Sequence, residues 1–297
     1  MISVDNMIGM IIGGCCGDVL GSQTEGMKHE DIIKRFNGNV TLMPEGKRYT
    51  DDSEMMLILL RHVAKHKTVK RDDLHVEYSK IDFKRGYSQN TREILVSIRN
   101  RTHSLNIGTS PCDGAVMRIA PLALLDVDDK ELRKNVQDAI YYTHGGNPDA
   151  HATAYVHCKL LKSLLSNENG FNRNKIFLHI LELAECHKPL WIKMNIVYRC
   201  INSTLDVHSI TKELTGDPNT FQIYAIDAFC CALYSFFLFY TEPMKAVSYA
   251  ASMGGDTDTI AKMTGDMCGA AYGTKWIPES WRNFEDEDEF MRLTKEF

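Results

Sequence analysis

The chain lacks several features that would divide it or assign it to a specialised class of protein. No stretch rich in proline, glycine or serine interrupts its 297 residues, so we expect one domain over residues 1–297 with a large core. No basic cluster occurs and the formal net charge is −5, which argues against a nucleic-acid partner. The alternating polar and apolar runs that are typical of strands are scarce.

Disulfides and membrane spans are not expected either. The nine cysteines are odd in number, lie mostly in apolar stretches and show no CxxC spacing, so we expect reduced thiols in the core. The apolar run "MIGMIIGGCCG" lacks a basic flank and is soon followed by Asp18, while "AFCCALYSFFLFY" (228–240) is too short to cross a bilayer. We therefore expect a cytoplasmic protein with no membrane partner.

What the chain does have is the apolar spacing of helices. In "SEMMLILLRHV" (53–63) apolar residues recur every three or four positions, which places them on one helix face. Similar patterns occur at 131–141, 153–165, 175–185 and 221–239. No fixed-period repeat indicates a solenoid. The sequence therefore predicts an all-α fold, a compact single-domain helical bundle.

Two segments repeat small residues at four-residue spacing. They are Gly9, Gly13, Gly17 and Gly21, and then Ala261, Gly265, Gly269 and Gly273. On a helix this spacing forms one face without the side chains that keep helix axes about 8–10 Å apart. Because each glycine inside a helix costs roughly 0.8–1.0 kcal/mol relative to alanine, such runs need a compensating contact. We expect close helix-to-helix packing near the centre, although "GGCCG" (13–17) could instead form a turn.

Two predicted helix starts each carry a pair of carboxylates and neighbouring hydroxyls. They are "TDDS" (50–53) and "DTDT" (256–259). Each could be a helix cap, but a cap uses one side chain. If the two starts meet, two like charges 4 Å apart repel by roughly 4 kcal/mol at an effective dielectric of 20. The sequence then predicts hard divalent cations between the helix starts, and two ions could together bind an oxygen-rich substrate and activate a water.

Three other features have alternative interpretations. "DTDT" is also similar to the nucleophile motif of haloacid-dehalogenase-type phosphotransferases, but that motif follows a buried strand near the chain start, and here a helical pattern precedes it. His62 and His66 have the spacing of a zinc pair, yet we expect a solvated helix face there and no metal. The acidic run "EDEDEF" (285–290) is expected to be solvated surface.

Five segments, in order, resemble the ADP-ribosylglycohydrolases, which include the dinitrogenase-reductase-activating glycohydrolases. They are "GCCGDVLGSQTEG" (14–26), "YTDDSEMML" (49–57), "DGAVMRIAPLAL" (113–124), "THGGNPDA" (143–150) and "GGDTDTIAKMTGDMCGAAYG" (254–273). The resemblance implies the all-α bundle of that family with a binuclear Mg²⁺ or Mn²⁺ centre. It also implies cleavage of the bond between C1″ of ADP-ribose and an acceptor.

The resemblance assigns roles residue by residue. The implied metal ligands are Thr50, Asp51, Asp52, Asp256, Asp258 and Thr259. Glu25 matches an acidic residue that borders the metal site, and with Asp258 it is a catalytic candidate. The implied substrate-binding residues are Ser110, Asp113, Gly114, His144 and Gly255. Many members have Gly-Asn-Gly at 112–114, so the contact made by Asp113 stays open, and His144 could equally be structural. Asp18 is expected to be structural.

The implied function is the reversal of ADP-ribosylation on proteins or on small ADP-ribose conjugates. In arginine-cleaving members the position of Ser110 can carry an acid, so the hydroxyl here favours O-linked substrates such as ADP-ribosyl-serine or O-acetyl-ADP-ribose. Arginine linkage stays open. The alternative is a non-catalytic ADP-ribose-binding or structural member, which we would expect to have lost ligand residues, whereas all six and Glu25 are present.

Overall fold

In the computed structural model of the protein, residues 2–102, 106–166, 172–203, 205–216 and 222–297 are described. All regular elements in these ranges are helical, and their single β feature is a bridge between Cys112 and Tyr224. The elements are α1 (Val4–Gly21), α2 (His29–Phe36), α3 (Asp51–His66), α4 (Arg71–Tyr78), α5 (Gln89–Arg99), η1 (Asp113–Ala115), η2 (Ala120–Leu124), α6 (Asp129–Ile140), α7 (Pro148–Leu165), α8 (Arg173–Ala184), α9 (Lys188–Cys200), α10 (Val207–Thr215), α11 (Ala225–Leu238), α12 (Pro243–Ala250), α13 (Thr257–Tyr272), η3 (Glu279–Trp281) and α14 (Glu287–Thr294). The predicted all-α bundle is confirmed.

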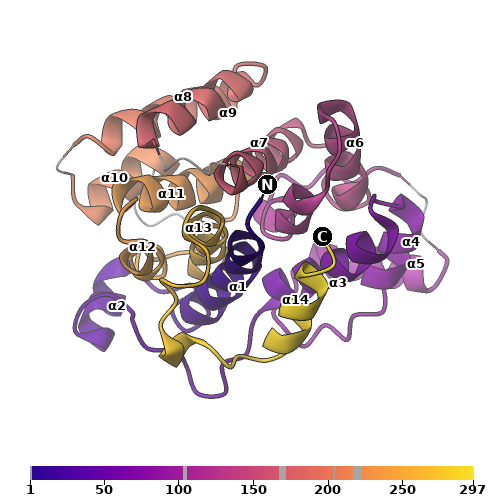
Figure 1. The fold of residues 1–297 in the computed structure, drawn as a ribbon, viewed down its shortest axis with the longest axis horizontal. Coiled ribbons are helices and arrows are strands. Elements are labelled where there is room, and N and C mark those ends of the chain that lie inside the picture. Colours follow the sequence, from indigo (N-terminus) through magenta and orange to yellow (C-terminus); the bar gives the residue numbers. More distant parts are fainter. Residues whose placement is uncertain (1, 103–105, 167–171, 204, 217–221) are drawn as a thin grey trace.

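Helices α1 and α13 lie side by side at the centre of the molecule (Figure 1). Their glycines face each other so closely that a Cβ added at Gly265 would stand 2.1 Å from the carbonyl oxygen of Gly13. A Cβ at Gly269 would stand 1.8 Å from the carbonyl oxygen of Gly9. Residue numbers therefore increase along α1 while the numbers of their contacts on α13 decrease, so the two helices are antiparallel. The predicted glycine packing is confirmed, and the alternative of a turn at 13–17 is wrong.

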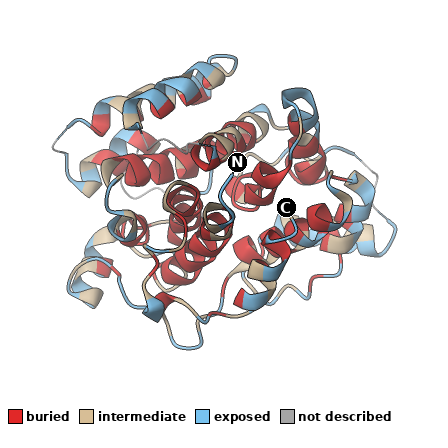
Figure 2. Cartoon of the chain, in the orientation of Figure 1, coloured by how far each residue is buried: buried red, intermediate tan, exposed pale blue. Residues whose placement is uncertain are grey.

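This central pair is buried on all sides (Figure 2). By length and mean hydropathy, 1.2, α1 has the composition of a membrane span, but 78% of it is buried inside the fold. A helix that is apolar all round is also what the core of a large soluble bundle requires. Helices α3, α7, α11 and α12 surround the pair, and α8 and α9 form an outer layer (Figure 1).

The cysteines of the chain are all free thiols. Seven of the nine are buried, as the sequence predicts, whereas Cys112 is half-buried and Cys186 is exposed. Burial raises the thiol pKa, to about 12 at Cys158, where charged lysines nearby offset it only in part. Because the thiolate is the reactive form, these buried cysteines are chemically inert packing residues.

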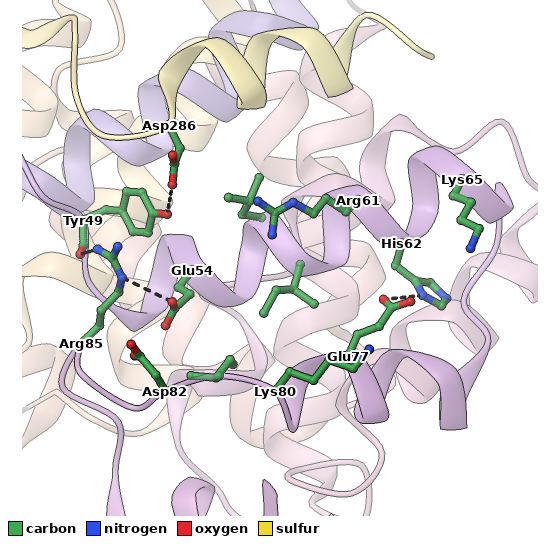
Figure 3. Close-up of a pocket in the computed structure, with 13 residues that line it drawn as sticks. Tyr49, Glu54, Arg61, His62, Lys65, Glu77, Lys80, Asp82, Arg85 and Asp286 are labelled. Carbon is green, nitrogen blue, oxygen red and sulfur yellow. Dashed lines mark hydrogen bonds and ion pairs between the residues drawn. The ribbon is translucent and has the colours of Figure 1, made fainter. Parts of the chain in front are cut away.

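The acidic run 285–290 is only in part the solvated surface that its composition suggests, because Asp286 and Asp288 are exposed whereas Glu287 is buried. The hydroxyl of Tyr49 donates a hydrogen bond to Asp286 at 2.7 Å. The guanidinium of Arg61 on α3 donates two hydrogen bonds to Glu289, at 2.8 and 2.7 Å. These contacts, visible in part in Figure 3, fasten the C-terminal segment across α3. The expectation of solvated surface therefore holds only in part, because some of these side chains have partners more than 200 residues away in the chain.

Candidate metal centre and substrate site

Asp18, buried in the middle of α1, fixes the start of α3. One carboxylate oxygen accepts a hydrogen bond from the backbone N–H of Thr50 at 3.0 Å, and the other accepts one from that of Ser53 at 3.0 Å. Thr50 is the N-cap of α3, and its hydroxyl accepts from the N–H of Asp52 at 3.3 Å. Asp18 therefore has the structural role that the sequence analysis expects, and it serves the predicted metal ligands.

A glycine turn leads into α13 and places its first residues. Gly254 and Gly255 have positive φ angles of 87° and 82°, a conformation that favours glycine. The carbonyl of Gly255 accepts from the N–H of Gly26 at 2.8 Å, so this turn packs on the segment that follows α1. A Cβ at Gly255 would stand 1.7 Å from Oε1 of Gln222. Gly255 therefore has a clear backbone role, and its predicted contact with substrate stays a prediction.

The two acidic helix starts lie together. Gly21, at the end of α1, packs directly on α13, since a Cβ there would stand 2.6 Å from the Cα of Asp258. Burial and then the charge of Asp258 raise the pKa of Asp52 well above its usual range, and Asp258 contributes more than the adjacent Asp51 does. For Asp51, burial and the charge of Asp18 raise the pKa to about 7. The helix starts that the sequence predicts to meet are thus brought together.

Asp113 belongs to the same group of acids. It is buried at the start of η1, and its side chain is in hydrogen-bonding contact with that of Asp256. Burial raises the pKa of Asp113 well above its usual range, and the charge of Asp52 raises it further. Burial and the charge of Asp113 do the same to Asp256. Its charged neighbours are therefore carboxylates, and we call Asp18, Asp51, Asp52, Asp113, Asp256 and Asp258 the acid cluster.

The acid cluster contains buried oxygen atoms without partners. One carboxylate oxygen each of Asp52, Asp113 and Asp258 is buried and accepts no hydrogen bond in the described part of the chain. An isolated buried carboxylate is strongly disfavoured. Mg²⁺ and its relatives prefer such oxygen ligands, and the hydroxyls of Thr50 and Thr259 lie at the same helix starts. The residues present thus fit hard divalent cations.

Glu25 lies at the solvent edge of the acid cluster. It is exposed, and it borders a cavity of about 620 Å³ together with Thr50 and Glu54. Partial burial and the charge of Asp18 raise its pKa above the usual range for glutamate. The structure thus places Glu25 next to the predicted ligands and open to a space in which a substrate could lie.

The predicted substrate loop and His144 also lie together. The N–H of Ser110 donates to the carbonyl of Thr143 at 3.2 Å, and a Cβ at Gly114 would stand 3.1 Å from the ring of His144. Burial and the nearby charge of Arg118 lower the pKa of His144 well below its usual range, so its ring is neutral. Nδ1 of this ring is buried and has no partner among the described residues. A histidine kept for structure alone would normally use that nitrogen.

The geometry agrees with the comparison to known proteins. The model of the family described as ADP-ribosylglycohydrolase matches residues 2–297. The chain belongs to the ADP-ribosylglycohydrolase family. It is 26% identical to "ADP-ribosylhydrolase ARH3" from Homo sapiens over 328 aligned positions, covering 94% of this chain and 89% of that one. It is 24% identical to "ADP-ribosyl-[dinitrogen reductase] glycohydrolase" from Rhodospirillum rubrum, covering 93% and 89%.

A solved structure supports the same fold assignment. The chain titled "ADP-ribosylglycohydrolase-related protein complex" superposes with a TM-score of 0.77 at 22% sequence identity. The match covers 99% of this chain and 96% of the other. The all-α architecture is therefore that of the ADP-ribosylglycohydrolase family, as the five motifs predict.

Two residues that hold predicted metal ligands of this protein lie outside the five sequence motifs. Oε1 of Gln222, a buried residue, accepts from the N–H of Asp256 at 3.3 Å. The carbonyl of Arg85 accepts from the N–H of Asp51 at 3.0 Å, and the next residue, Gly86, has a φ of 94°. Both contacts hold a predicted ligand from outside its own helix. No local pattern reveals either, because each partner lies more than 30 residues away.

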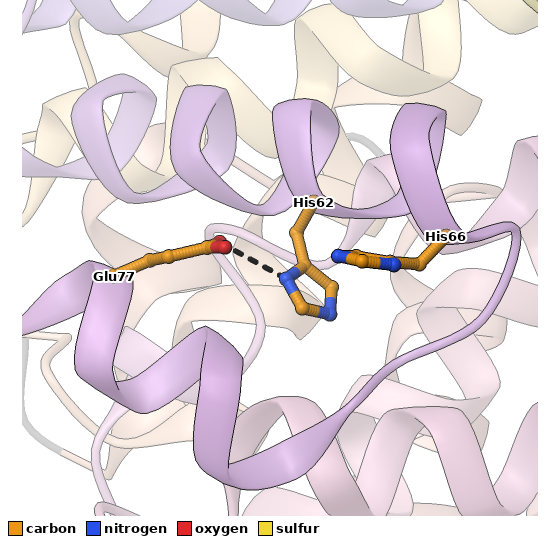
Figure 4. A group of neighbouring side chains, drawn as sticks. All are labelled: His62, His66 and Glu77. Atoms are coloured by element: carbon orange, nitrogen blue, oxygen red, sulfur yellow. Dashed lines mark hydrogen bonds and ion pairs between the residues drawn. The ribbon is translucent and has the colours of Figure 1, made fainter.

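His62, His66 and Glu77 form a separate group of possible ligands (Figure 4). They are the one trio of His, Cys, Asp or Glu ligand atoms in the described chain that lie within 4.8 Å of one another. Nδ1 of His62 contacts Glu77 at 2.9 Å, and Nε2 accepts from the N–H of Lys70 at 3.0 Å. Both ring nitrogens of His62 are thus in use, and the residue is 1% exposed, so it is a structural histidine and the expectation of a solvated helix face is wrong there.

Proposed function

We propose that this protein is a divalent-metal-dependent hydrolase that cleaves the glycosidic bond at C1″ of ADP-ribose. The substrate is ADP-ribose attached to a serine or arginine side chain of a protein, or to a small acceptor as in O-acetyl-ADP-ribose, and the reaction reverses ADP-ribosylation. The observation that carries the proposal is the acid cluster, in which carboxylates from four segments meet with buried, unpartnered oxygens. Family membership supports the class of reaction.

Two Mg²⁺ or Mn²⁺ ions are the proposed cofactors. The residues proposed to hold them are Thr50, Asp51, Asp52, Asp256, Asp258 and Thr259. When bound, such a pair supplies positive charge that orients substrate oxygens and polarises them.

Glu25 is the proposed acid and base of the reaction. Glycosidic cleavage passes through a state with oxocarbenium character and commonly needs a carboxyl group that protonates the leaving oxygen. A raised pKa keeps a glutamate protonated closer to neutral pH, and both burial and Asp18 act in that direction on Glu25. Its position at the open edge of the acid cluster gives it access to a substrate and to water.

The proposed binding site for the ADP-ribose lies beside the acid cluster. There Ser110, Gly114 and the neutral His144 meet, with Gly255 in the turn before α13. Backbone N–H groups and a neutral imidazole can approach a diphosphate and its riboses without adding negative charge. Asp113 is the exception, and its position among the acids suits a role toward a cation better than a contact with phosphate. The Ser110 hydroxyl supports an O-linked acceptor, with arginine linkage as the alternative.

Substrate turnover tests the proposal. Release of ADP-ribose from ADP-ribosylated serine peptide, ADP-ribosylated arginine peptide and O-acetyl-ADP-ribose is measured in parallel with Mg²⁺, with Mn²⁺ and with EDTA. We expect metal-dependent hydrolysis of at least one substrate. Tight ADP-ribose binding with no turnover under any condition would instead identify a non-catalytic ADP-ribose-binding member.

We further propose that the enzyme acts in the cytoplasm, which suits its nine free thiols.

A further inference from the structure

Two cavities adjoin on the side of the acid cluster where Glu25 lies. The first, of about 620 Å³, borders Glu25 and Thr50. The second, of about 600 Å³, runs between α3 and α4 as far as His62 and Lys65 (Figure 3). Four lining residues are common to both: Tyr49, Glu54, Asp82 and Arg85. We call the two cavities together the α3 groove.

The wall between the two cavities is held by several contacts of Arg85, which also joins it to the acid cluster. The guanidinium of Arg85 donates to the carbonyl of Tyr49 at 2.8 Å and to Glu285 at 2.9 Å. It also stacks 4.1 Å from the centre of the Tyr49 ring. The carbonyl of the same arginine accepts from the N–H of Asp51. A ligand in the α3 groove would therefore lie at a set position relative to the predicted metal ligands. Its binding would need little conformational entropy to order the side chains of the wall.

The lining of the far cavity has the character of a peptide-binding surface. Its floor includes the apolar Leu57, Ile58 and Ile81, and most of its other lining residues, such as the exposed Lys65 and Lys80, have charged side chains. Apolar pockets between polar edges are how grooves accept alternate side chains of an extended polypeptide. An acetyl group or a single serine would occupy only a small part of a groove of this size.

The length of the groove sets the length of its occupant. From Glu54 to Lys65 the groove follows α3 over eleven residue-to-residue steps, which is about 16 Å at 1.5 Å per step. An extended chain advances about 3.3 Å per residue, so about five residues would fill this distance.

We infer that the α3 groove binds the polypeptide that carries the ADP-ribose. The modified side chain lies at the Glu25 end, about five residues on one side of it extend along α3, and one apolar side chain rests on the floor around Ile58. This inference rests on the proposed function, and it adds a subsite for the protein part of the substrate that is separate from the site for ADP-ribose.

Peptide length is the first test, and it needs only the wild-type enzyme. The substrates are the free ADP-ribosylated amino acid, in whichever linkage is hydrolysed, and an eleven-residue peptide modified at its centre, with versions shortened from either end. We expect kcat/KM for the full peptide to exceed that for the free amino acid by about tenfold or more, the effect of one well-buried apolar contact. Shortening from one end should remove the advantage, and shortening from the other should not.

Ile58→Glu places a charge on the floor of the groove and is the second test. We expect the ratio of kcat/KM for peptide to that for free amino acid to fall about tenfold. The matched control is Leu178→Glu, at a leucine that is 47% exposed on the distant helix α8, and its ratio should equal the wild-type ratio. Turnover of the free amino acid by Ile58→Glu shows whether that variant folds. If it does not fold, the comparison of peptide lengths with the wild-type enzyme still tests the inference.

The possible failures are distinguishable. Equal kcat/KM for the free amino acid and every peptide would overturn the α3 groove inference and leave the proposed function intact. The same holds if shortening from both ends has equal effects. No metal-dependent turnover of any substrate would overturn the proposed function, and with it this inference.

Discussion

The carboxylate of Asp18 accepts a hydrogen bond from the backbone N–H of Thr50 at 3.0 Å. Through this contact a residue in the central helix α1 sets where α3 begins, and so where Asp51 and Asp52 stand. Asp18→Ala should therefore leave the N–H groups of Thr50 and Ser53, at the start of α3, without this partner, at a cost of about 1–3 kcal/mol in the free energy of unfolding. We also expect about 10- to 100-fold weaker Mn²⁺ binding, because a group that orients ligands is lost.

Calorimetric titration of Mn²⁺ and urea denaturation measure these two effects. The control is Asp73→Ala, which removes an exposed aspartate on α4 and should change neither quantity. Unchanged Mn²⁺ affinity in Asp18→Ala would show that Asp18 does not position the metal ligands.

The stability of the metal-free protein should depend on pH in the direction set by the acid cluster. The folded-state pKa of Asp51, about 7, lies above the unfolded value of about 3.9. The folded protein therefore binds more protons, and this contribution to stability is lost as pH rises through about 7. In EDTA, the melting temperature should increase when the pH is lowered from 8 to 6, and Asp51→Asn should reduce that increase.

Added Mg²⁺ should reverse this dependence. Cations bind the deprotonated carboxylates, so the stabilisation by Mg²⁺ should grow as pH rises. Identical pH dependence of melting with and without Mg²⁺ would contradict the assignment of the acid cluster as a cation site.

The glycine contact between α1 and α13 should tolerate no added methyl group. In Gly265→Ala the new Cβ would stand 2.1 Å from a backbone oxygen of α1, so the helices must separate. We expect a loss of about 2 kcal/mol or more in the free energy of unfolding, larger than the gain in helix propensity.

Gly46→Ala controls for the general effect of adding a methyl group at glycine. There the Cβ would meet only the Arg48 side chain at 3.9 Å, and the positive φ of 78° should cost about 1 kcal/mol. Urea denaturation compares the two variants. If both lose the same stability, the closeness of the central helices is not what the glycines provide.

A buried ion pair lies one turn beyond the acid cluster. Nζ of Lys262 is 3.1 Å from Asp266, and both side chains are fully buried on α13. Lys262→Met should cost about 3–5 kcal/mol in the free energy of unfolding, because the buried aspartate would lose its lysine and keep only His157, at 3.8 Å, beside it. The double variant Lys262→Met, Asp266→Asn should be less destabilised than the two single changes together. Additive effects in this cycle would show that the pair is not coupled.

Local patterns predict the parts of this protein that depend on one helix at a time. Apolar spacing predicts α3 and α7, and four-residue glycine spacing predicts the face of α1 that meets Gly265. The acidic helix starts can be recognised in the sequence because a helix cap uses one carboxylate, whereas "TDDS" has two. Each of these features has a physical cause that lies within about 20 consecutive residues.

The features that sequence patterns miss depend on partners far apart in the chain. Nothing near Glu289 in the sequence shows that Arg61 will pair with it, so the segment around Glu289 is predicted to be solvated surface. Arg85 holds Asp51 through a backbone carbonyl that any residue type could supply, and the side chain of Gln222 holds Asp256 from 34 residues away. Asp113 is placed by the motif next to substrate, and only the fold shows that it stands among the acids.

The central claim is that the two acidic helix starts bind metal ions together, and titration of Mn²⁺ into EDTA-treated protein tests it most directly. We predict two ions per chain for the wild type. For Asp258→Asn we predict loss of this binding and of turnover, with a melting temperature in EDTA no lower than the wild-type value, because one buried like charge is removed. Wild-type protein that binds no Mn²⁺, or Asp258→Asn protein that binds it as the wild type does, would contradict the account.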